Sequence, residues 1–136
     1  MDKESIFKSI VATVGTMFSA LFGAWDIALQ ILVLFVVLDY LTGMLRGIIN
    51  KDLSSNAGFK GIAKKSVIFI VLIVGVSLDR LLNTGQWVFR SLICYFYIAN
   101  EGISILENCG ALGLPLPEKL KDTLIQLKEG NRKGDK

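Results

Sequence analysis

Residues 31–38 read Ile-Leu-Val-Leu-Phe-Val-Val-Leu, and residues 67–74 read Val-Ile-Phe-Ile-Val-Leu-Ile-Val. A helix built from either run is apolar on every side, and such a helix lies in a membrane or in the core of a large protein. A chain of 136 residues is too small to bury both runs, because most of a small domain is surface. The two runs therefore favour a membrane protein over a water-soluble helical bundle.

Four apolar blocks occupy most of the chain: residues 9–25, 27–45, 66–83 and 88–106. Each is about as long as a spanning helix, which needs about 17–25 mostly apolar residues. Apolar residues make up 52% of the chain and the mean hydropathy is +0.54, above ordinary globular usage. We predict an all-α integral membrane protein with three to four transmembrane helices and a short amphipathic cytoplasmic helix near the C-terminus.

The basic residues indicate the topology. They gather before the first block (residues 1–8), between the second and third blocks (residues 46–65) and after the last block (residues 107–136). Positively charged segments stay on the cytoplasmic side. Four spans satisfy this rule, and so do three if the first block lies on or beside the outer surface. The middle loop and the C-terminus are expected in the cytoplasm in both cases.

The first block has a face of small residues. On a helix, its candidates for lining a pore share one side: Ser9, Thr13, Thr16, Ser19, Ala20 and Gly23. Small residues also allow close helix packing in a bilayer, and a helix lying on the membrane surface would usually carry Lys or Arg on its polar face. Close packing, pore lining and a surface position therefore stay open for this helix.

A second polar face lies on the second block. Asp39, Thr42, Gly43 and Gly47 fall on one side of a helix, together with Arg46. Two glycines four residues apart let another backbone approach closely, so we expect this face to serve helix packing and oligomerisation. The alternative is that Asp39 lies near the membrane edge and pairs with a local lysine.

Further polar residues lie on or beside the last block. Asn100, Glu101 and Ser104 are, with Asp39, the expected intramembrane polar residues, and Asn108 continues their stripe. Polar residues within the membrane normally face protein or water. The alternative for this stripe is that the helix emerges there into the membrane interface. Trp25 and Trp87 are expected as interfacial anchors on the outer side. The adjacent residues 79–80, Asp-Arg, are expected in a solvated turn there.

Nothing in the sequence indicates catalysis. Histidine is absent, and no nucleophile with a neighbouring base, phosphate-binding glycine loop or metal-ligand cluster is present. Cys94 and Cys109 do not have metal-ligand spacing. A net charge of +3 without a basic stripe gives no reason to expect nucleic acid as a partner. We predict a protein that is not an enzyme and has no catalytic residues, cofactor or metal.

Five short motifs, in order, resemble the toxin-secretion/phage-lysis holin family. They are residues 38–43 (Leu-Asp-Tyr-Leu-Thr-Gly), 50–55 (Asn-Lys-Asp-Leu-Ser-Ser), 58–65 (Gly-Phe-Lys-Gly-Ile-Ala-Lys-Lys), 97–108 (Tyr-Ile-Ala-Asn-Glu-Gly-Ile-Ser-Ile-Leu-Glu-Asn) and 113–120 (Gly-Leu-Pro-Leu-Pro-Glu-Lys-Leu). The resemblance extends from about residue 23 to residue 127. Each motif is weak alone, but their order and spacing together are specific.

The resemblance implies a multi-pass protein of the bacterial cytoplasmic membrane. Such proteins accumulate in the lipid bilayer, form homo-oligomers and then permeabilise the membrane. A muralytic endolysin can then reach the cell wall, and some relatives export a large toxin. Direct contact between the membrane protein and the released protein is not required. The family supplies no catalytic or binding residues to transfer to this chain. A small ion channel or transporter, and a membrane anchor for a protein partner, are the alternative functions.

Overall fold

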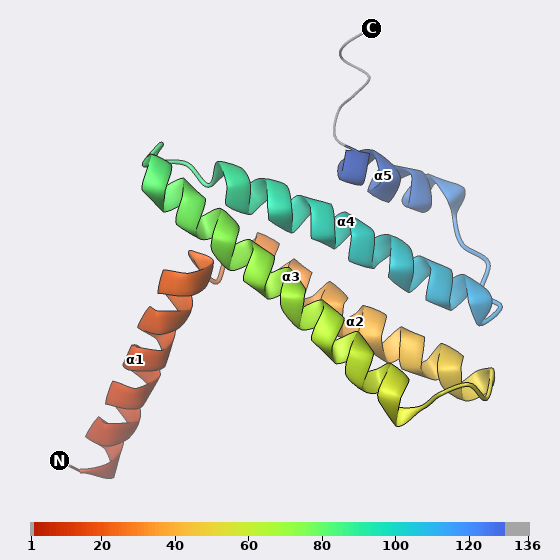
Figure 1. Cartoon of the computed structure of the whole chain (residues 1–136), viewed down its shortest axis with the longest axis horizontal. Coiled ribbons are helices and arrows are strands. Elements are labelled where there is room, and N and C mark those ends of the chain that lie inside the picture. Colours follow the sequence, from red (N-terminus) through yellow and green to blue (C-terminus); the bar gives the residue numbers. More distant parts are fainter. Residues whose placement is uncertain (1, 130–136) are drawn as a thin grey trace, which may run out of the picture.

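The computed structural model describes residues 2–129, and these form five helices. They are α1 (Lys3–Phe22), α2 (Ile27–Ile49), α3 (Ser55–Leu82), α4 (Val88–Ala111) and α5 (Glu118–Glu129), shown in Figure 1. No strand occurs among the described residues. The prediction of an all-α, helical membrane protein is confirmed.

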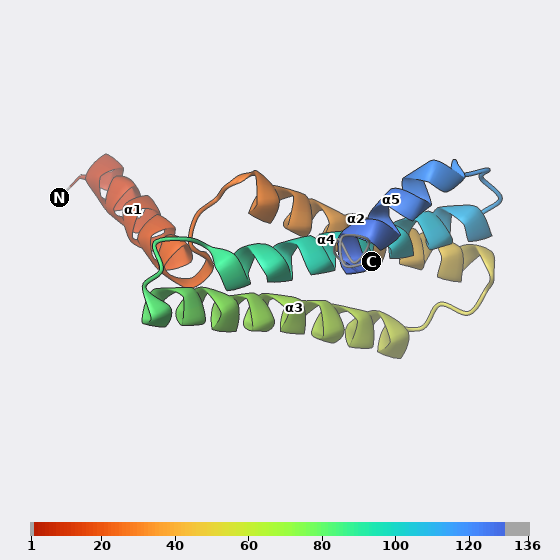
Figure 2. The ribbon, with the colours of Figure 1, turned by 90° about the horizontal axis from the view of Figure 1, so that it is seen from above.

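Helices α2, α3 and α4 form a bundle that runs along the long axis of the molecule (Figures 1 and 2). Successive helices reverse direction, so α2 and α4 run in parallel and α3 runs against both. The buried core draws on all three helices: Leu29, Leu32, Val36, Ile68, Leu72, Cys94 and Ile98. We call the end with the α2–α3 connection and the end of α4 the loop end, and the opposite end the junction end.

Helix α1 leaves the bundle at the junction end and splays away from it (Figures 1 and 2). None of its residues is buried. Only its last turns touch the bundle, where the ring of Phe22 meets the ring of Phe69 edge to face at 6.1 Å. Most of α1 is therefore free of contacts within the chain.

Three helices are long and apolar enough to cross a membrane: α1, α2 and α3. Helix α4 is not among them, because Arg90, Asn100 and Glu101 interrupt its apolar sequence. That α4 also crosses the membrane stays a prediction. The number of spans, three or four, likewise stays open.

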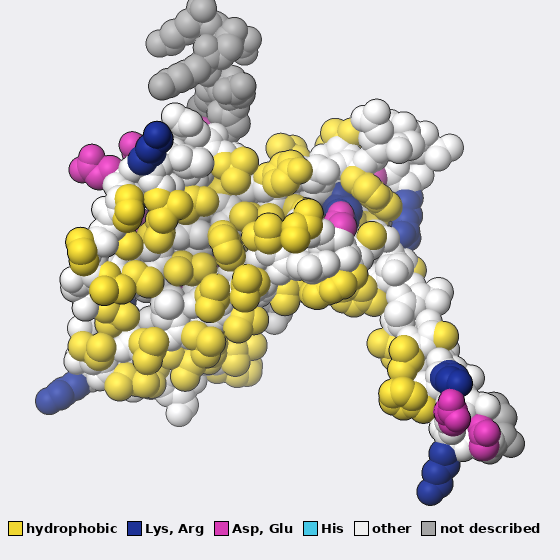
Figure 3. Space-filling view, turned by 180° about the vertical axis from the view of Figure 1, so that it is seen from behind, with side chains coloured by type: hydrophobic (Ala, Val, Ile, Leu, Met, Phe, Trp, Pro, Cys, Tyr) yellow, Lys and Arg dark blue, Asp and Glu magenta, His cyan; other side chains and the backbone are white. Residues whose placement is uncertain are grey.

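The outward surfaces of α2 and α3 are apolar. Hydrophobic side chains cover much of the bundle in Figure 3, and the charged side chains visible there lie mostly toward its margins. The exposed residues include Leu34, Val37, Leu41 and Leu45 on α2, and Val67, Ile70 and Val74 on α3. A soluble monomer rarely exposes an apolar surface of this extent, so it is suited to contact with lipid.

The helix bounds differ from the expected blocks at the loop end. Helix α2 continues to Ile49, and α3 begins at Ser55 within the stretch expected as a loop, because the side chain of Ser54 caps it by accepting a 3.1 Å hydrogen bond from the Ala57 amide. Lysines of this stretch therefore lie on a helix. The expected tail is described as far as Glu129, and residues 130–136 lie outside the described part.

Gly75 is required where α3 crosses α4. A Cβ at this position would collide with Cδ1 of Ile93 and lie 3.5 Å from the Phe89 backbone. We expect Gly75→Leu to lower the free energy of unfolding in detergent by about 1–3 kcal/mol, the usual cost of overpacking. Gly15→Leu is the control, because a Cβ at Gly15 has no neighbour within 4 Å. Equal stability of the two variants would contradict this role of Gly75.

Candidate functional site

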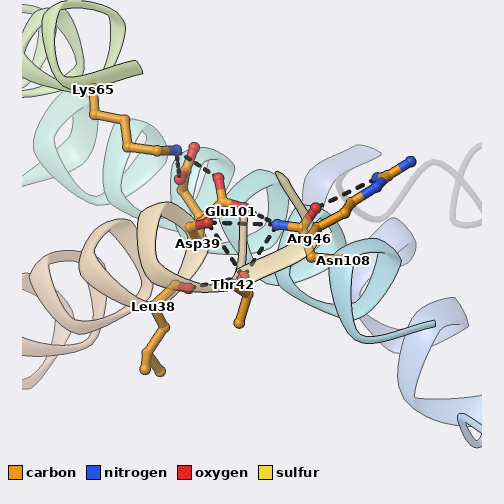
Figure 4. A network of polar contacts seen from close by, with 7 residues as sticks. All are labelled: Leu38, Asp39, Thr42, Arg46, Lys65, Glu101 and Asn108. Carbon is orange, nitrogen blue, oxygen red and sulfur yellow. Dashed lines mark hydrogen bonds and ion pairs between the residues drawn. The ribbon is translucent and has the colours of Figure 1, made fainter. Parts of the chain in front are cut away.

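The structure brings polar residues of three helices into one buried cluster near the loop end (Figure 4). The Nζ atom of Lys65 on α3 lies 2.5 Å from Oδ2 of Asp39 on α2 and 2.6 Å from Oε2 of Glu101 on α4. The side chains of the two carboxylates are 8% and 5% exposed, and that of Lys65 is 18% exposed. One ammonium group thus joins two carboxylates and holds three helices together.

Asn108 extends this cluster along the contact between α2 and α4. Its Nδ2 atom donates to Oδ1 of Asp39 at 3.1 Å and to Oγ1 of Thr42 at 3.0 Å, and its Oδ1 atom accepts from Arg46 at 3.5 Å (Figure 4). We refer to Asp39, Thr42, Lys65, Glu101 and Asn108 as the buried polar cluster. It joins the stripe predicted on α2 to the stripe predicted on α4.

Charges inside an apolar bundle are costly unless they are paired and hydrogen-bonded. Among the residues that the structure describes, no buried side-chain nitrogen or oxygen lacks a hydrogen-bond partner. The cluster is therefore a satisfied network, and its energetic role lies in the penalty that follows when one member is removed. Two interpretations of Asp39 were left open, a helix-packing face and a pairing with a local lysine. The structure contains both features, because Asp39 lies at a contact between helices and pairs with Lys65.

A cavity of about 420 Å³ opens beside the cluster. Its walls combine Asp39 and Gly43 of α2, Gly61 and Lys65 of α3, and Ser104 of α4. The glycines leave room there because they carry no side chain. Of the other predicted intramembrane residues, Asn100 is half-buried, and no hydrogen bond joins it to the cluster among the described contacts.

The two glycines predicted for helix packing face other parts of the same chain. A Cβ at Gly43 would lie 3.7 Å from Nδ2 of Asn108, and one at Gly47 would lie 3.3 Å from Cδ1 of Leu53. Their face is thus occupied within the chain by α4 and by the α2–α3 connection. A contact between copies of the protein through this face stays a prediction.

A second polar site clamps the junction end. The guanidinium of Arg90, which is 2% exposed, donates to the carbonyl oxygens of Phe22 at 2.6 Å and Ala24 at 2.9 Å. It also donates hydrogen bonds to both carboxylate oxygens of Asp26, at 2.7 and 2.9 Å. A planar guanidinium matches a carboxylate in this way, so one side chain of α4 holds the link between α1 and α2.

The expectation of a solvated Asp-Arg turn at residues 79–80 is wrong in two respects: both residues lie within α3, and only Arg80 is exposed. Asp79 is buried, and its carboxylate accepts hydrogen bonds from the amides of Phe89 at 2.9 Å and Arg90 at 2.8 Å, which caps α4. Arg80 donates to the carbonyl oxygens of Ser19 and Ala20, the last turn of α1. A signal for this contact was present in the sequence: α4 starts after Trp87, which cannot accept a capping hydrogen bond, and Asp79 lies a short distance before it.

Asp26 lies between α1 and α2, outside the spanning segments. The hydrogen-bonded guanidinium of Arg90 is the main reason why the pKa of this carboxyl lies below its usual range. A carboxyl with a lowered pKa stabilises the fold at pH values above its ordinary pKa, and this contribution is lost as the pH falls through the lowered value. The clamp is therefore intact at neutral pH.

Both tryptophans lie at the junction end. Trp25 is 55% exposed and Trp87 is 37% exposed, and the guanidinium carbons of Arg80 and Arg90 each lie 5.8 Å from the centre of the Trp87 ring. They share one end of the bundle, which is the arrangement that anchoring at one membrane surface requires. The anchoring itself stays a prediction.

The small face of α1 is exposed from Ser9 to Ala20, and only Gly23 at its end lies against the Arg90 side chain. Thr13 and Thr16 donate their hydroxyls to the carbonyl oxygens of Ser9 and Ala12, each at 2.8 Å, and Gly23 ends the helix with φ +89°. The hydroxyl donors of Thr13 and Thr16 are thus satisfied along the helix itself. Pore lining, close packing and a surface position for α1 all stay predictions.

Residues 2–129 contain no group of three or more acidic, histidine or cysteine side chains placed to hold a metal ion. Cys94 is buried and Cys109 is half-buried, and both are free thiols. Apart from the exposed pair of Glu4 and Lys8 within α1, the ion pairs of the described residues belong to the buried polar cluster and to the contact of Arg90 with Asp26. Both sites join helices.

Comparison with known proteins gives one consistent result. The sequence pattern of the bacteriophage holin family matches residues 16–129. An uncharacterized 14.9 kDa protein of Clostridium perfringens is 60% identical over 117 residues, covering 86% of this chain and 89% of that protein. A probable holin of Bacillus phage phi105 is 31% identical over 104 residues, covering 76% of each chain. No solved structure matches.

Proposed function

The chain belongs to the bacteriophage holin family, and from this premise we propose that it oligomerises in the bacterial cytoplasmic membrane and opens lesions there at a set time. The lesions release a muralytic endolysin, or a large toxin, that waits in the cytoplasm. The observation that carries this proposal is the family match over residues 16–129, which is supported by the similarity to a probable phage holin.

The surface of the bundle supports this function. Helices α2 and α3 expose apolar side chains over their lengths, as a protein surrounded by lipid requires. The polar residues that the bundle contains are paired with one another inside it. We propose that the chain works as a membrane assembly and catalyses no reaction.

We also propose an orientation. Four basic residues lie toward the loop end and are exposed: Arg46, Lys51, Lys60 and Lys64. Basic residues next to spanning helices stay in the cytoplasm. The loop end and the C-terminus therefore face the cytoplasm, and the junction end with its two tryptophans faces outward, with α4 crossing beside α2 and α3.

The test is to induce the protein in bacteria and follow membrane potential, viability and turbidity, with and without an endolysin kept in the cytoplasm. A holin gives a silent period, then sudden depolarisation, and lysis only when the endolysin is present. A slow leak of ions without release of the endolysin would contradict the proposal and favour a selective channel. No effect at normal membrane levels would favour an anchoring subunit.

Gly43→Leu tests the role of the α2–α4 contact in this activity. The added side chain must displace Asn108 from Asp39 and Thr42, so we expect lysis to be delayed or abolished while the protein still inserts. Lysis timing and membrane content are measured together. Leu45→Ala, on the exposed side of α2, is the control and should leave the timing unchanged. Normal timing for Gly43→Leu would contradict the packing argument.

A further inference from the structure

Helix α5 folds back over the outward side of α4 and runs against it (Figures 1 and 2). A Cβ at Gly102 of α4 would lie 3.1 Å from Cδ1 of Leu124, so the two helices are in close contact there. Farther along, the Nζ atom of Lys128 lies 5.7 Å from the centre of the Phe96 ring. Helix α5 therefore covers the middle of α4.

Half of the side chains of α5 are charged, and all of those are exposed: Glu118, Lys119, Lys121, Asp122, Lys128 and Glu129. Of its apolar residues, Leu124 and Ile125 are half-buried, and Leu124 lies against α4. A helix of this composition needs water along its outer side.

The position of α5 conflicts with lipid on that side of α4. Phe96 lies about four helical turns before the end of α4 at Ala111, which is about 22 Å at 1.5 Å per residue. The hydrocarbon core of a bilayer is about 30 Å thick. If α4 crosses the membrane with lipid beside it, Lys128 and Glu129 lie deep in hydrocarbon, where charged side chains are strongly disfavoured.

The other sides of the bundle show the opposite character. At a similar level, α2 exposes Leu34 and α3 exposes Ile70 and Val74. Two helices of the bundle thus present apolar side chains outward, and the third is covered by a charged helix as far as Phe96, beyond which it exposes Leu92 and Val88. The bundle has one side suited to lipid and another that, from the loop end to Phe96, is suited to water.

We propose that in the assembled lesion α4 and α5 face the water-filled lumen, whereas α2 and α3 face lipid. This inference rests on the proposed function. The α5 helices of neighbouring copies then line the lumen together. Each carries three acidic and three basic side chains, so identical helices that face one another in water can attract through opposite charges. In this arrangement α1 is not needed to line the lumen.

The first experiment compares labelling of two cysteines at a similar level. In a Cys94→Ala/Cys109→Ala background that still opens lesions, Gln126→Cys lies on the exposed side of α5 and Leu34→Cys lies on α2. A membrane-impermeant methanethiosulfonate is added after triggering, without endolysin. We expect Gln126→Cys to react at least about tenfold faster, because the reacting thiolate is excluded from lipid. Equal rates would overturn the proposal.

The second experiment asks whether α5 stays on α4 in the membrane. Gly102→Cys combined with Leu124→Cys should form a disulfide on oxidation, since these positions are in contact. The control pairs Gly102→Cys with Gln126→Cys, on the opposite side of α5, and should remain reduced. Without a disulfide in the first pair, α5 is detached in the cytoplasm and the proposal fails.

The third experiment tests whether α4 begins on the outer side of the membrane, as its crossing requires. Thr84→Cys, in the turn before α4, should react with the impermeant reagent added outside intact cells before triggering. Labelling only from the cytoplasm would place α4 on one membrane surface and overturn the proposal. Lesions that open while Gln126→Cys stays protected would overturn the lumen assignment alone, whereas an absence of lesions in the unmodified protein would overturn the proposed function as well.

Discussion

Replacing Lys65 with methionine is expected to lower the free energy of unfolding by about 3–5 kcal/mol, the cost of leaving a buried charge without its partner. The variant keeps the size of the side chain but leaves Asp39 and Glu101 facing each other without a cation between them. Unfolding of the purified protein in mixed micelles with increasing sodium dodecyl sulfate measures the change. We expect lysis in cells to fail or to be strongly delayed.

The neighbouring residue provides a matched control. Lys64 lies beside Lys65 on α3 but is exposed, and no ion pair involves it among the described contacts. Lys64→Met should therefore change stability by less than about 0.5 kcal/mol. Equal losses for Lys64→Met and Lys65→Met would show that removal of a positive charge, and not the buried contact, is responsible.

A rescue separates charge from shape. Adding Asp39→Asn and Glu101→Gln to Lys65→Met removes both uncompensated carboxylates while keeping groups of similar size. Because replacing a whole buried ion cluster is far less harmful than breaking it, the triple variant should regain most of the lost stability. A triple variant that is less stable than Lys65→Met alone would contradict this account of the cluster.

Replacing Arg90 with methionine is expected to cost about 3 kcal/mol and to release α1 from its present direction. The change leaves two carbonyl oxygens, of Phe22 and Ala24, without the donors that now hold them, and hydrogen bonds to a charged group are worth about 1.5–3 kcal/mol each. The bidentate contact with Asp26 is lost as well.

Spin labels measure the direction of α1 directly. A label at Val14→Cys on α1 and another at Ile70→Cys on α3 occupy exposed positions, and both native cysteines are replaced. The distance distribution should be narrow with Arg90 present and broad in Arg90→Met. Arg80→Met is the comparison: Arg80 also donates to carbonyl oxygens of α1, those of Ser19 and Ala20, but from an exposed position. Its loss should therefore cost less and broaden the distribution less than Arg90→Met. A narrow distribution in Arg90→Met would show that other contacts hold α1.

The sequence by itself determined that this chain is helical and belongs in a membrane. Residues 31–38 and 67–74 are apolar on every side of a helix, and this property depends only on local composition and on the length of the run. The start of α3 at Ser55 was not determined in this way, because the residues that follow its capping serine are mostly small or polar and were expected to form a loop. The family resemblance was found from the order of short motifs, which needs no knowledge of the fold.

Only the tertiary structure decided which polar residues meet. Asp39, Lys65 and Glu101 lie on three helices, and their contact depends on how each helix is rotated and shifted along its neighbours. The same holds for Arg90, which lies near the start of the last apolar block, is buried, and binds the link between α1 and α2. Helical periodicity predicts on which face of its own helix a side chain lies. Which residue of another helix it contacts is decided by the packing of apolar side chains that are distant in the sequence.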